Sequence, residues 1–312
     1  MDCFLIGFGN AGINYDKKND FKTQQSHFSS VYNCKKIKRI FIFDKNTDLY
    51  KKIDLKKKIE KKIIFLKQFP IQMSFSFAII ATTTNSHYPI IKKLTINNNV
   101  KNILCEKPFT NQLRNSIDLF SYLKKKKINL YINYQRRYLP VFYSIKKLLK
   151  RKKILKIECN YSKGIYENAC HFINLFILYF GKPKNIKVFK KSKSLNTFVK
   201  ADFLMSFEKF YINFKSYSDF YKNKNIIIFY FQNEKIMIRN NQLYYFKIYK
   251  KKYRLENKYK KINDQLKENI GNYQYYALNN YLKQKKNYKC IQDAILTLKI
   301  MQKVKNEKFA KK

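Results

Sequence analysis

A glycine-rich hexapeptide near the start of the chain sets the strongest constraint on its fold. Residues 3–6 (Cys-Phe-Leu-Ile) form a short apolar run that leads into Gly7-Phe8-Gly9-Asn10-Ala11-Gly12. A strand followed by this spacing is typical of a dinucleotide-binding unit. The first glycine permits a tight turn and the second lets the backbone approach a pyrophosphate. The third lets the following helix pack closely, with its N-terminal N–H groups facing the phosphates. Three of the chain's six glycines lie here, and we predict that residues 7–12 bind the cofactor.

Four more short apolar runs follow, and helical stretches separate them. The runs are 40–43, 77–81, 102–105 and 128–133. We expect Pro89 to open a helix, since proline suits a first helical position, and we expect a second helix over about 111–127. Short β-rich runs with helices between them predict a parallel, doubly wound sheet. Ligands of such sheets bind outside the carboxyl ends of the strands.

The pattern changes after residue 134. We expect a helix at about 139–150, a strand at about 154–161, and a helix at about 167–180 that Gly181 ends. Over about 184–248, β-branched, aromatic and polar residues alternate, which predicts a largely antiparallel sheet. Two helices are expected over about 268–306. The predicted fold is therefore α/β, with a doubly wound parallel sheet in residues 1–133 and an α/β domain with a large, mainly antiparallel open sheet in residues 134–312.

The chain is very basic, with 67 Lys and Arg against 20 Asp and Glu. Such a charge suggests binding to nucleic acid or anionic membranes. Only seven of the 67 are arginine, and Lys, Asn, Ile, Phe and Tyr are abundant where Gly, Pro and Trp are scarce. That pattern is typical of A/T-rich codon drift, and base recognition relies more on the planar fork of arginine. We favour drift and expect no specific nucleic-acid partner, although nonspecific electrostatic binding remains open.

The six cysteines form no CxxC pair and have no metal-ligand spacing. We therefore expect reduced thiols, no metal site and a cytoplasmic protein. Met1-Asp2 leads straight into an apolar strand, so no signal peptide is expected. No run of 18 apolar residues occurs, so no membrane span is expected either.

Asp44 ends the second apolar run and is the candidate ribose ligand. A carboxylate there can hold the ribose hydroxyls and repels a 2′-phosphate, which favours NAD. Lys45 stands beside it, so NADP is not excluded. The gap from Gly12 exceeds the usual ~20 residues, and we expect an inserted loop within residues 14–32.

Glu106-Lys107-Pro108 follows the fourth apolar run. Lys107 is one of many lysines, but an apolar strand delivers it to the carboxyl edge of the sheet, where Pro108 ends the strand. A cation there could hold a substrate hydroxyl and stabilise alkoxide character as hydride leaves.

His171 is one of three histidines and lies on an otherwise apolar helix. Taken alone, this setting favours a core histidine with satisfied ring nitrogens, and the alternative is a general base near neutral pH. The segment Tyr134-Gln135-Arg136-Arg137-Tyr138 holds two of the seven arginines. It indicates an anion or sugar clamp, or equally a surface patch.

With these residues in view, the chain resembles the Gfo/Idh/MocA oxidoreductase family. Five segments carry the resemblance in the family's order, namely residues 7–12, 80–89, 105–109, 133–140 and 168–175. The resemblance implies a Rossmann domain and a mainly antiparallel sheet, often used for homo-oligomerisation as a dimer or tetramer. It also implies an enzyme that uses NAD(P) to oxidise or reduce a hydroxyl carbon of a small-molecule substrate, which is a sugar, a cyclitol or a nucleotide-sugar. Surface-polysaccharide sugar synthesis is one setting in which such an enzyme acts.

The resemblance also implies roles for single residues. Lys107 matches the lysine of the family's Glu-Lys-Pro motif, and His171 matches the histidine of its Asp-x-x-x-His motif. The aspartate position holds Glu167, with Asn168 next to it, so either could be the second catalytic residue. Implied cofactor contacts are Thr82, Thr83, Asn85, His87, Glu106 and Lys107, and implied substrate contacts are Tyr134, Arg136 and Arg137.

Two expectations follow from these matches. We expect the ammonium of Lys107 and the imidazole of His171 to face one cavity beside the nicotinamide. The departure at Glu167 and Asn168 keeps an alternative open, in which the chain is a non-catalytic, NAD-binding regulator of the same fold.

Overall fold

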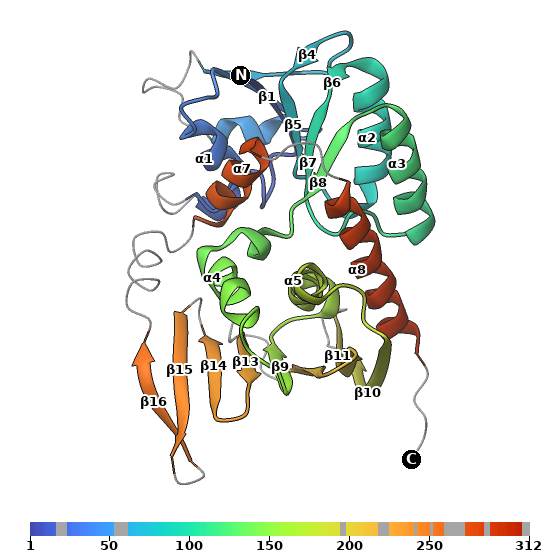
Figure 1. Ribbon diagram of the computed structural model, residues 1–312. Coiled ribbons are helices and arrows are strands. Elements are labelled where there is room, and N and C mark those ends of the chain that lie inside the picture. Colours follow the sequence, from blue (N-terminus) through green and yellow to red (C-terminus); the bar gives the residue numbers. More distant parts are fainter. Residues whose placement is uncertain are drawn as a thin grey trace. The chain divides into compact units, whose positions relative to one another are not determined.

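The computed structural model describes residues 1–16, 24–52, 62–193, 198–217, 225–239, 242–249, 252–258, 272–283 and 288–307 (Figure 1). The chain divides into two compact units. Unit 1 is Met1–Gln135 with Gly271–Ile295, and unit 2 is Arg136–Ile270 with Leu296–Lys312. The sequence placed all of residues 134–312 in the second domain, so the structure differs by returning residues 271–295 to unit 1.

Unit 1 contains a six-stranded sheet in which every neighbouring pair is parallel. Its strands are β1 (Asp2–Ile6), β2 (Arg39–Phe43), β3 (Ile63–Phe65), β5 (Phe77–Ile80), β7 (Asn102–Cys105) and β8 (Asn129–Ile132). Their order is β3-β2-β1-β5-β7-β8. The predicted doubly wound sheet is therefore confirmed, and its order reverses between β1 and β5, the switch point at which such folds bind ligands.

Helices cover this sheet, as a doubly wound fold requires. The helices are α1 (His27–Tyr32), α2 (Thr84–Asn97), α3 (Leu113–Lys125) and α7 (Tyr273–Lys283), with 3-10 turns η1 (Asn14–Asp16) and η2 (Thr47–Lys52). Helix α2 packs against α3, and α1 packs against α7 (Figure 1). A small parallel pair, β4 (Ser74–Phe75) and β6 (Asn99–Val100), lies outside the main sheet.

Helix α2 does not begin at Pro89, as the sequence predicted. It begins at Thr84 and carries Pro89 inside it. Proline removes one backbone hydrogen bond from a helix interior. The first turn has other support, because the Ser86 hydroxyl lies 2.8 Å from both the Thr82 hydroxyl and the Thr83 carbonyl.

Helix α7, near the C-terminus of the chain, belongs to unit 1 because its apolar side chains pack in the core of that unit. Leu278 and Tyr281 of α7 belong to the buried apolar cluster that holds the first strand. The Tyr281 ring centroid lies 5.0 Å from that of Tyr131 and 5.6 Å from that of Phe77. The helix was predicted from its pattern, but nothing in that pattern says which core its apolar face covers.

Unit 2 is built on an eight-stranded sheet, of which the described residues give the order β10-β11-β12-β9-β13-β14-β15-β16. The strands are β9 (Lys156–Tyr161), β10 (Asn185–Lys193), β11 (Val199–Ser206), β12 (Tyr211–Ser216), β13 (Ile226–Tyr230), β14 (Glu234–Arg239), β15 (Gln242–Tyr249) and β16 (Lys252–Lys258). All neighbours are antiparallel except β9 and β12. The mainly antiparallel sheet predicted from the alternating pattern is confirmed.

Helices α4 (Pro140–Leu149) and α5 (Cys170–Phe180) complete unit 2. The last helix, α8 (Lys289–Asn306), contains the boundary between the units. Helix α5 packs on the sheet, with the Phe176 ring 5.9 Å from that of Phe214. It ends as predicted at Gly181, whose φ of 80° is a left-handed value that favours glycine.

No helix within the described ranges is long and apolar enough to cross a membrane.

Candidate functional site

The glycine turn that follows β1 is too crowded for side chains at two of its three glycines. Gly7 has a φ of 93°, and a Cβ on it would lie 2.7 Å from Cγ2 of Thr82. A Cβ on Gly12 would lie 2.4 Å from the carbonyl oxygen of Gly7. The third glycine differs, because nothing lies within 4 Å of the place where a Cβ on Gly9 would be. Neighbouring atoms therefore leave no room for a side chain at Gly7 and Gly12, whereas the space beside Gly9 is open.

The open side of this turn presents backbone N–H groups. The N–H of Ile13 donates to the Gly9 carbonyl at 2.9 Å, which closes one helical turn. Among the described residues, no hydrogen bond is found for the N–H groups of Gly9, Asn10, Ala11 and Gly12. Unbonded N–H groups at the start of a helical turn attract anions. The residues present therefore fit a dinucleotide pyrophosphate.

The predicted helix after Gly12 is interrupted. Only one turn and the short η1 follow the glycines, and α1 begins at His27. The hydrogen-bond ladder nevertheless resumes, because the His27 N–H donates to the Ala11 carbonyl at 3.0 Å and the Phe28 N–H to the Gly12 carbonyl at 2.9 Å. The expected insertion thus lies inside the first helix of the fold, and residues 17–23 of it are outside the described residues.

Asp44 follows β2 and binds the glycine turn. One carboxylate oxygen accepts the Phe8 N–H at 2.6 Å, and the other accepts the Asn46 N–H at 2.9 Å. The Tyr50 hydroxyl also accepts the Asp44 N–H at 2.8 Å. Asp44 therefore lies at the predicted edge of the sheet with its carboxylate beside the turn, half-buried.

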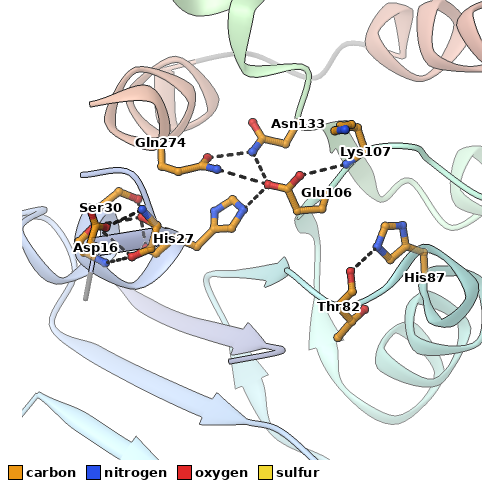
Figure 2. Close-up of polar contacts among 11 residues, drawn as sticks. Asp16, His27, Ser30, Thr82, His87, Glu106, Lys107, Asn133 and Gln274 are labelled. Carbon is orange, nitrogen blue, oxygen red and sulfur yellow. Dashed lines mark hydrogen bonds and ion pairs between the residues drawn. The ribbon is translucent and has the colours of Figure 1, made fainter. Parts of the chain in front are cut away.

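The segment after β5 lies across the switch point from the glycine turn. Thr83 is the N-cap residue of α2, and the Asn85 side chain accepts a hydrogen bond from Asn111 at 2.9 Å. His87 is fully buried. Its Nε2 lies 3.1 Å from the Thr82 carbonyl (Figure 2). Its Nδ1 lies 3.0 Å from the Pro108 carbonyl. The structure therefore gives His87 a role in holding two loops together.

Glu106 is the centre of a buried polar cluster that the sequence did not indicate (Figure 2). Its Oε1 lies 2.7 Å from Nε2 of His27, accepts a hydrogen bond from Asn133 at 2.7 Å, and lies 3.3 Å from Nε2 of Gln274. Its Oε2 accepts the Lys107 N–H at 3.2 Å. The partners come from α1, the end of β8 and α7.

The charge state of Glu106 follows from this cluster. Burial raises the pKa of its carboxyl group, but the hydrogen bond and charge of His27, the hydrogen bond from Asn133 and the charge of Lys107 outweigh burial and lower the pKa to about 2. The side chain is only 14% exposed. Glu106 is therefore a carboxylate, and Lys107 follows it, half-buried, at the carboxyl end of β7.

The predicted residues of unit 2 lie around a π-helical turn (Ile165–Ala169) directly before α5. Such turns are frequent at functional sites. His171 lies in the first turn of α5 and is 6% exposed. Glu167 folds back on the turn, since a Cβ on Gly164 would lie 2.1 Å from its Oε2.

Asn168 is a buried link between several elements of unit 2. Its Nδ2 donates to the Ser162 carbonyl at 3.0 Å and to the Asn225 side chain at 2.7 Å. Its Oδ1 accepts from Nη2 of Arg136 at 2.7 Å. The Arg136 guanidinium also lies 4.2 Å from the Phe172 ring centroid. The structure therefore makes Asn168 a residue that positions Arg136.

Tyr134 and Arg137, the other predicted substrate contacts, differ from each other. Tyr134 is fully buried, which favours packing over contact with a substrate, whereas Arg137 is half-buried. Lys107 and Tyr134 belong to unit 1, and Arg136, Arg137 and His171 belong to unit 2. No group of His, Cys, Asp and Glu that could hold a metal is found in the part of the chain that the structure describes.

Comparison with known proteins agrees with this geometry. Residues 1–134 match the profile of the Gfo/Idh/MocA oxidoreductase family with its NAD-binding Rossmann fold. The resemblance seen in the sequence is thus confirmed, and a nicotinamide dinucleotide fits as the cofactor. No curated protein matches the chain in sequence.

Solved structures similar to this chain extend the likeness to its whole length. UDP-N-acetylglucosamine 3-dehydrogenase GnnA from Acidithiobacillus ferrooxidans is 14% identical, with a TM-score of 0.68 over 97% of this chain and 96% of that one. The dehydrogenase MviM from Clostridium difficile is 16% identical, with a TM-score of 0.65 over 97% and 99%. The probable oxidoreductase yhhX is 16% identical, with a TM-score of 0.71 over 100% of both chains. At these identities the likeness shows a shared fold.

Proposed function

We propose that the chain is an NAD(P)-dependent oxidoreductase that transfers hydride to or from a hydroxyl carbon of a sugar, cyclitol or nucleotide-sugar. The observation that carries the proposal is the glycine turn at the switch point, where Gly9 is open and no described residue accepts a hydrogen bond from the N–H groups of residues 9–12. A turn of this kind is suited to a pyrophosphate.

Four of the predicted groups carry the chemistry of this proposal, namely residues 9–12, Asp44, Lys107 and His171. The N–H groups of residues 9–12 hold the pyrophosphate, and Asp44, which already receives two N–H groups, accepts the ribose hydroxyls with its remaining lone pairs. When bound, the nicotinamide supplies the hydride acceptor or donor. Lys107 orients the substrate hydroxyl and stabilises its negative charge, and His171 takes or returns the hydroxyl proton.

The substrate class rests on two supports. GnnA, which shares the fold, is named as a dehydrogenase of a UDP-sugar. In this chain Arg136 is fixed by a hydrogen bond to Asn168 and by stacking on Phe172. A fixed guanidinium suits a phosphate or carboxylate on the substrate. We therefore place nucleotide-sugars first among the candidate substrates. We further propose that the protein acts in the cytoplasm as a homo-oligomer.

The proposal is tested by binding first and by turnover second. Native mass spectrometry of the purified protein identifies the bound nucleotide, and NADH fluorescence measures its affinity. A panel of UDP-sugars, free sugars and cyclitols is then screened for NAD(P) reduction. Lys107→Ala and His171→Ala should bind NADH and lose turnover. Lys101→Ala is the matched control, because Lys101 is exposed and precedes β7 at the opposite edge of the sheet. Normal turnover by the Lys107 or His171 variant would exclude the role assigned to that residue.

A specific observation supports a second candidate, a regulator that binds NAD without turnover. The Asn168 amide is committed to Ser162, Asn225 and Arg136, and an amide does not exchange a proton at working pH. If the protein is such a regulator, it should bind NADH tightly and turn over no member of the substrate panel.

A further inference from the structure

His27 contacts two parts of unit 1 through different atoms. Its backbone N–H donates to the Ala11 carbonyl in the glycine turn at 3.0 Å. Its ring Nε2 lies 2.7 Å from Oε1 of Glu106, after β7 (Figure 2). The His27 side chain is 1% exposed. One buried residue thus connects the glycine turn to the segment that carries Lys107.

The contact continues from Glu106 to the Lys107 backbone. The two carboxylate oxygens have different partners, because Oε1 binds His27 and Asn133 whereas Oε2 accepts the Lys107 N–H at 3.2 Å. Rotation of the carboxylate after loss of His27 would therefore remove the bond to the Lys107 N–H. In a buried network of this kind, the loss of one member weakens the remaining bonds.

The position of His27 is itself well fixed. It is the first residue of α1, and the N-cap Ser26 accepts the Ser29 N–H through its hydroxyl at 3.1 Å. The buried Asp16 accepts the N–H groups of Gln25 and Ser26 at 2.9 and 2.6 Å. A displacement of the glycine turn would therefore move the start of α1, including His27, as one rigid element.

We propose that His27 is a positioning residue that couples the glycine turn to Lys107 through Glu106. The inference rests on the proposed function for the roles of the glycine turn and Lys107, and it adds that occupancy of the turn stabilises the Lys107 segment. On the other side of that segment, His87 lies between the Pro108 and Thr82 carbonyls, whereas the His27 N–H bonds the glycine turn itself at the Ala11 carbonyl.

The first arm of the test measures hydrogen exchange of the Lys107 amide in the protein without ligand. In His27→Ala this amide should exchange about tenfold faster than in the native protein, because its acceptor is no longer held. His27→Gln keeps an N–H donor and should restore most of the protection. Ser30→Ala is the matched control, since Ser30 is buried in the same helix and its hydroxyl donates to the His27 carbonyl at 3.1 Å, away from the His27 ring. Its Lys107 amide should exchange at the native rate.

The second arm uses ADP, which lacks the nicotinamide half and so cannot cover Lys107 as a full dinucleotide could. ADP should slow exchange of the Lys107 amide in the native protein and leave it unchanged in His27→Ala. Failure of ADP and NADH to bind would contradict the proposed function, whereas the first arm would still decide the role of His27.

Several results would overturn the inference. One is a folded His27→Ala whose Lys107 amide keeps native protection, and another is an ADP effect of equal size in both proteins. If His27→Ala does not fold, Glu106→Gln replaces it, and native exchange at Lys107 in that variant contradicts the inference equally. Where turnover is established, His27→Ala should lower kcat by about tenfold or more with the substrate KM little changed, as expected for misplacement of a catalytic group.

Discussion

The Asn168 side chain accepts a hydrogen bond from Arg136 through Oδ1, at 2.7 Å, while its Nδ2 donates to oxygen atoms of two residues, Ser162 and Asn225. Both the oxygen and the nitrogen of the Asn168 amide are thus hydrogen-bonded, and this predicts the effect of replacing Asn168 with aspartate. In Asn168→Asp, a second carboxylate oxygen would face the Ser162 carbonyl and the Asn225 oxygen. We expect a loss of about 1–3 kcal/mol in the free energy of unfolding, in spite of a closer ion pair with Arg136. Urea unfolding measures the difference.

Asn233→Asp is the control for this variant, because Asn233 is exposed in the turn between β13 and β14. It should unfold as the native protein does. An Asn168→Asp protein at least as stable as the native one would show that the amide donor is dispensable.

The fold of unit 1 was predictable because its signals are local. Each apolar run forms a strand of the parallel sheet, and the glycine spacing fixed the position of the turn. The Glu106 cluster was not predictable. His27 and Glu106 are 79 residues apart, and Gln274 is 168 residues from Glu106. A glutamine in an amphipathic helix looks like any surface residue until the partner helix is known. The scarcity of histidine was the only signal that could have pointed to His27.

Similar reasoning explains the error at Pro89 and the difference between the motif and the contacts at Asn168. Proline favours a first helical position, but side-chain bonds of Ser86 let α2 begin five residues earlier. Asn168 was a catalytic candidate because of its place in a motif, whereas the structure commits its amide to three neighbours. A motif fixes which residue stands at a position but not how its polar atoms are used.

The glycines of the turn predict two different effects of alanine. In Gly9→Ala the Cβ meets nothing within 4 Å, so stability should be retained, whereas NADH should bind about tenfold or more weakly, since the methyl group occupies the space of the pyrophosphate. In Gly12→Ala the Cβ would lie 2.4 Å from the Gly7 oxygen, so the fold should lose about 1–3 kcal/mol. Urea unfolding and NADH titration of both variants check this, and equal effects would contradict the assignment.

The cluster at Glu106 predicts a stability change in acid. Its pKa lies at about 2 in the folded protein against 4.5 for the unperturbed group. Because the folded value is the lower one, the carboxylate stabilises the fold above about pH 4.5, and this contribution is lost as the pH falls towards 2. The maximum contribution is about 3 kcal/mol. Urea unfolding of the native protein and Glu106→Gln should differ most near neutral pH and converge in acid. A difference independent of pH would contradict the assignment.

The last prediction concerns the helix that returns to unit 1. The Tyr281 ring packs on Tyr131 and Phe77, but its buried hydroxyl has no hydrogen-bond partner among the described residues. A buried hydroxyl without a partner costs about 1–3 kcal/mol. Tyr281→Phe keeps the ring and should raise the free energy of unfolding by about 1 kcal/mol, whereas Tyr281→Ala leaves a cavity and should lower it by about 3–5 kcal/mol. Thermal and urea unfolding of both variants check the signs. A destabilised Tyr281→Phe would mean that the hydroxyl is hydrogen-bonded in solution, and an unchanged Tyr281→Ala would mean that α7 is not part of this core.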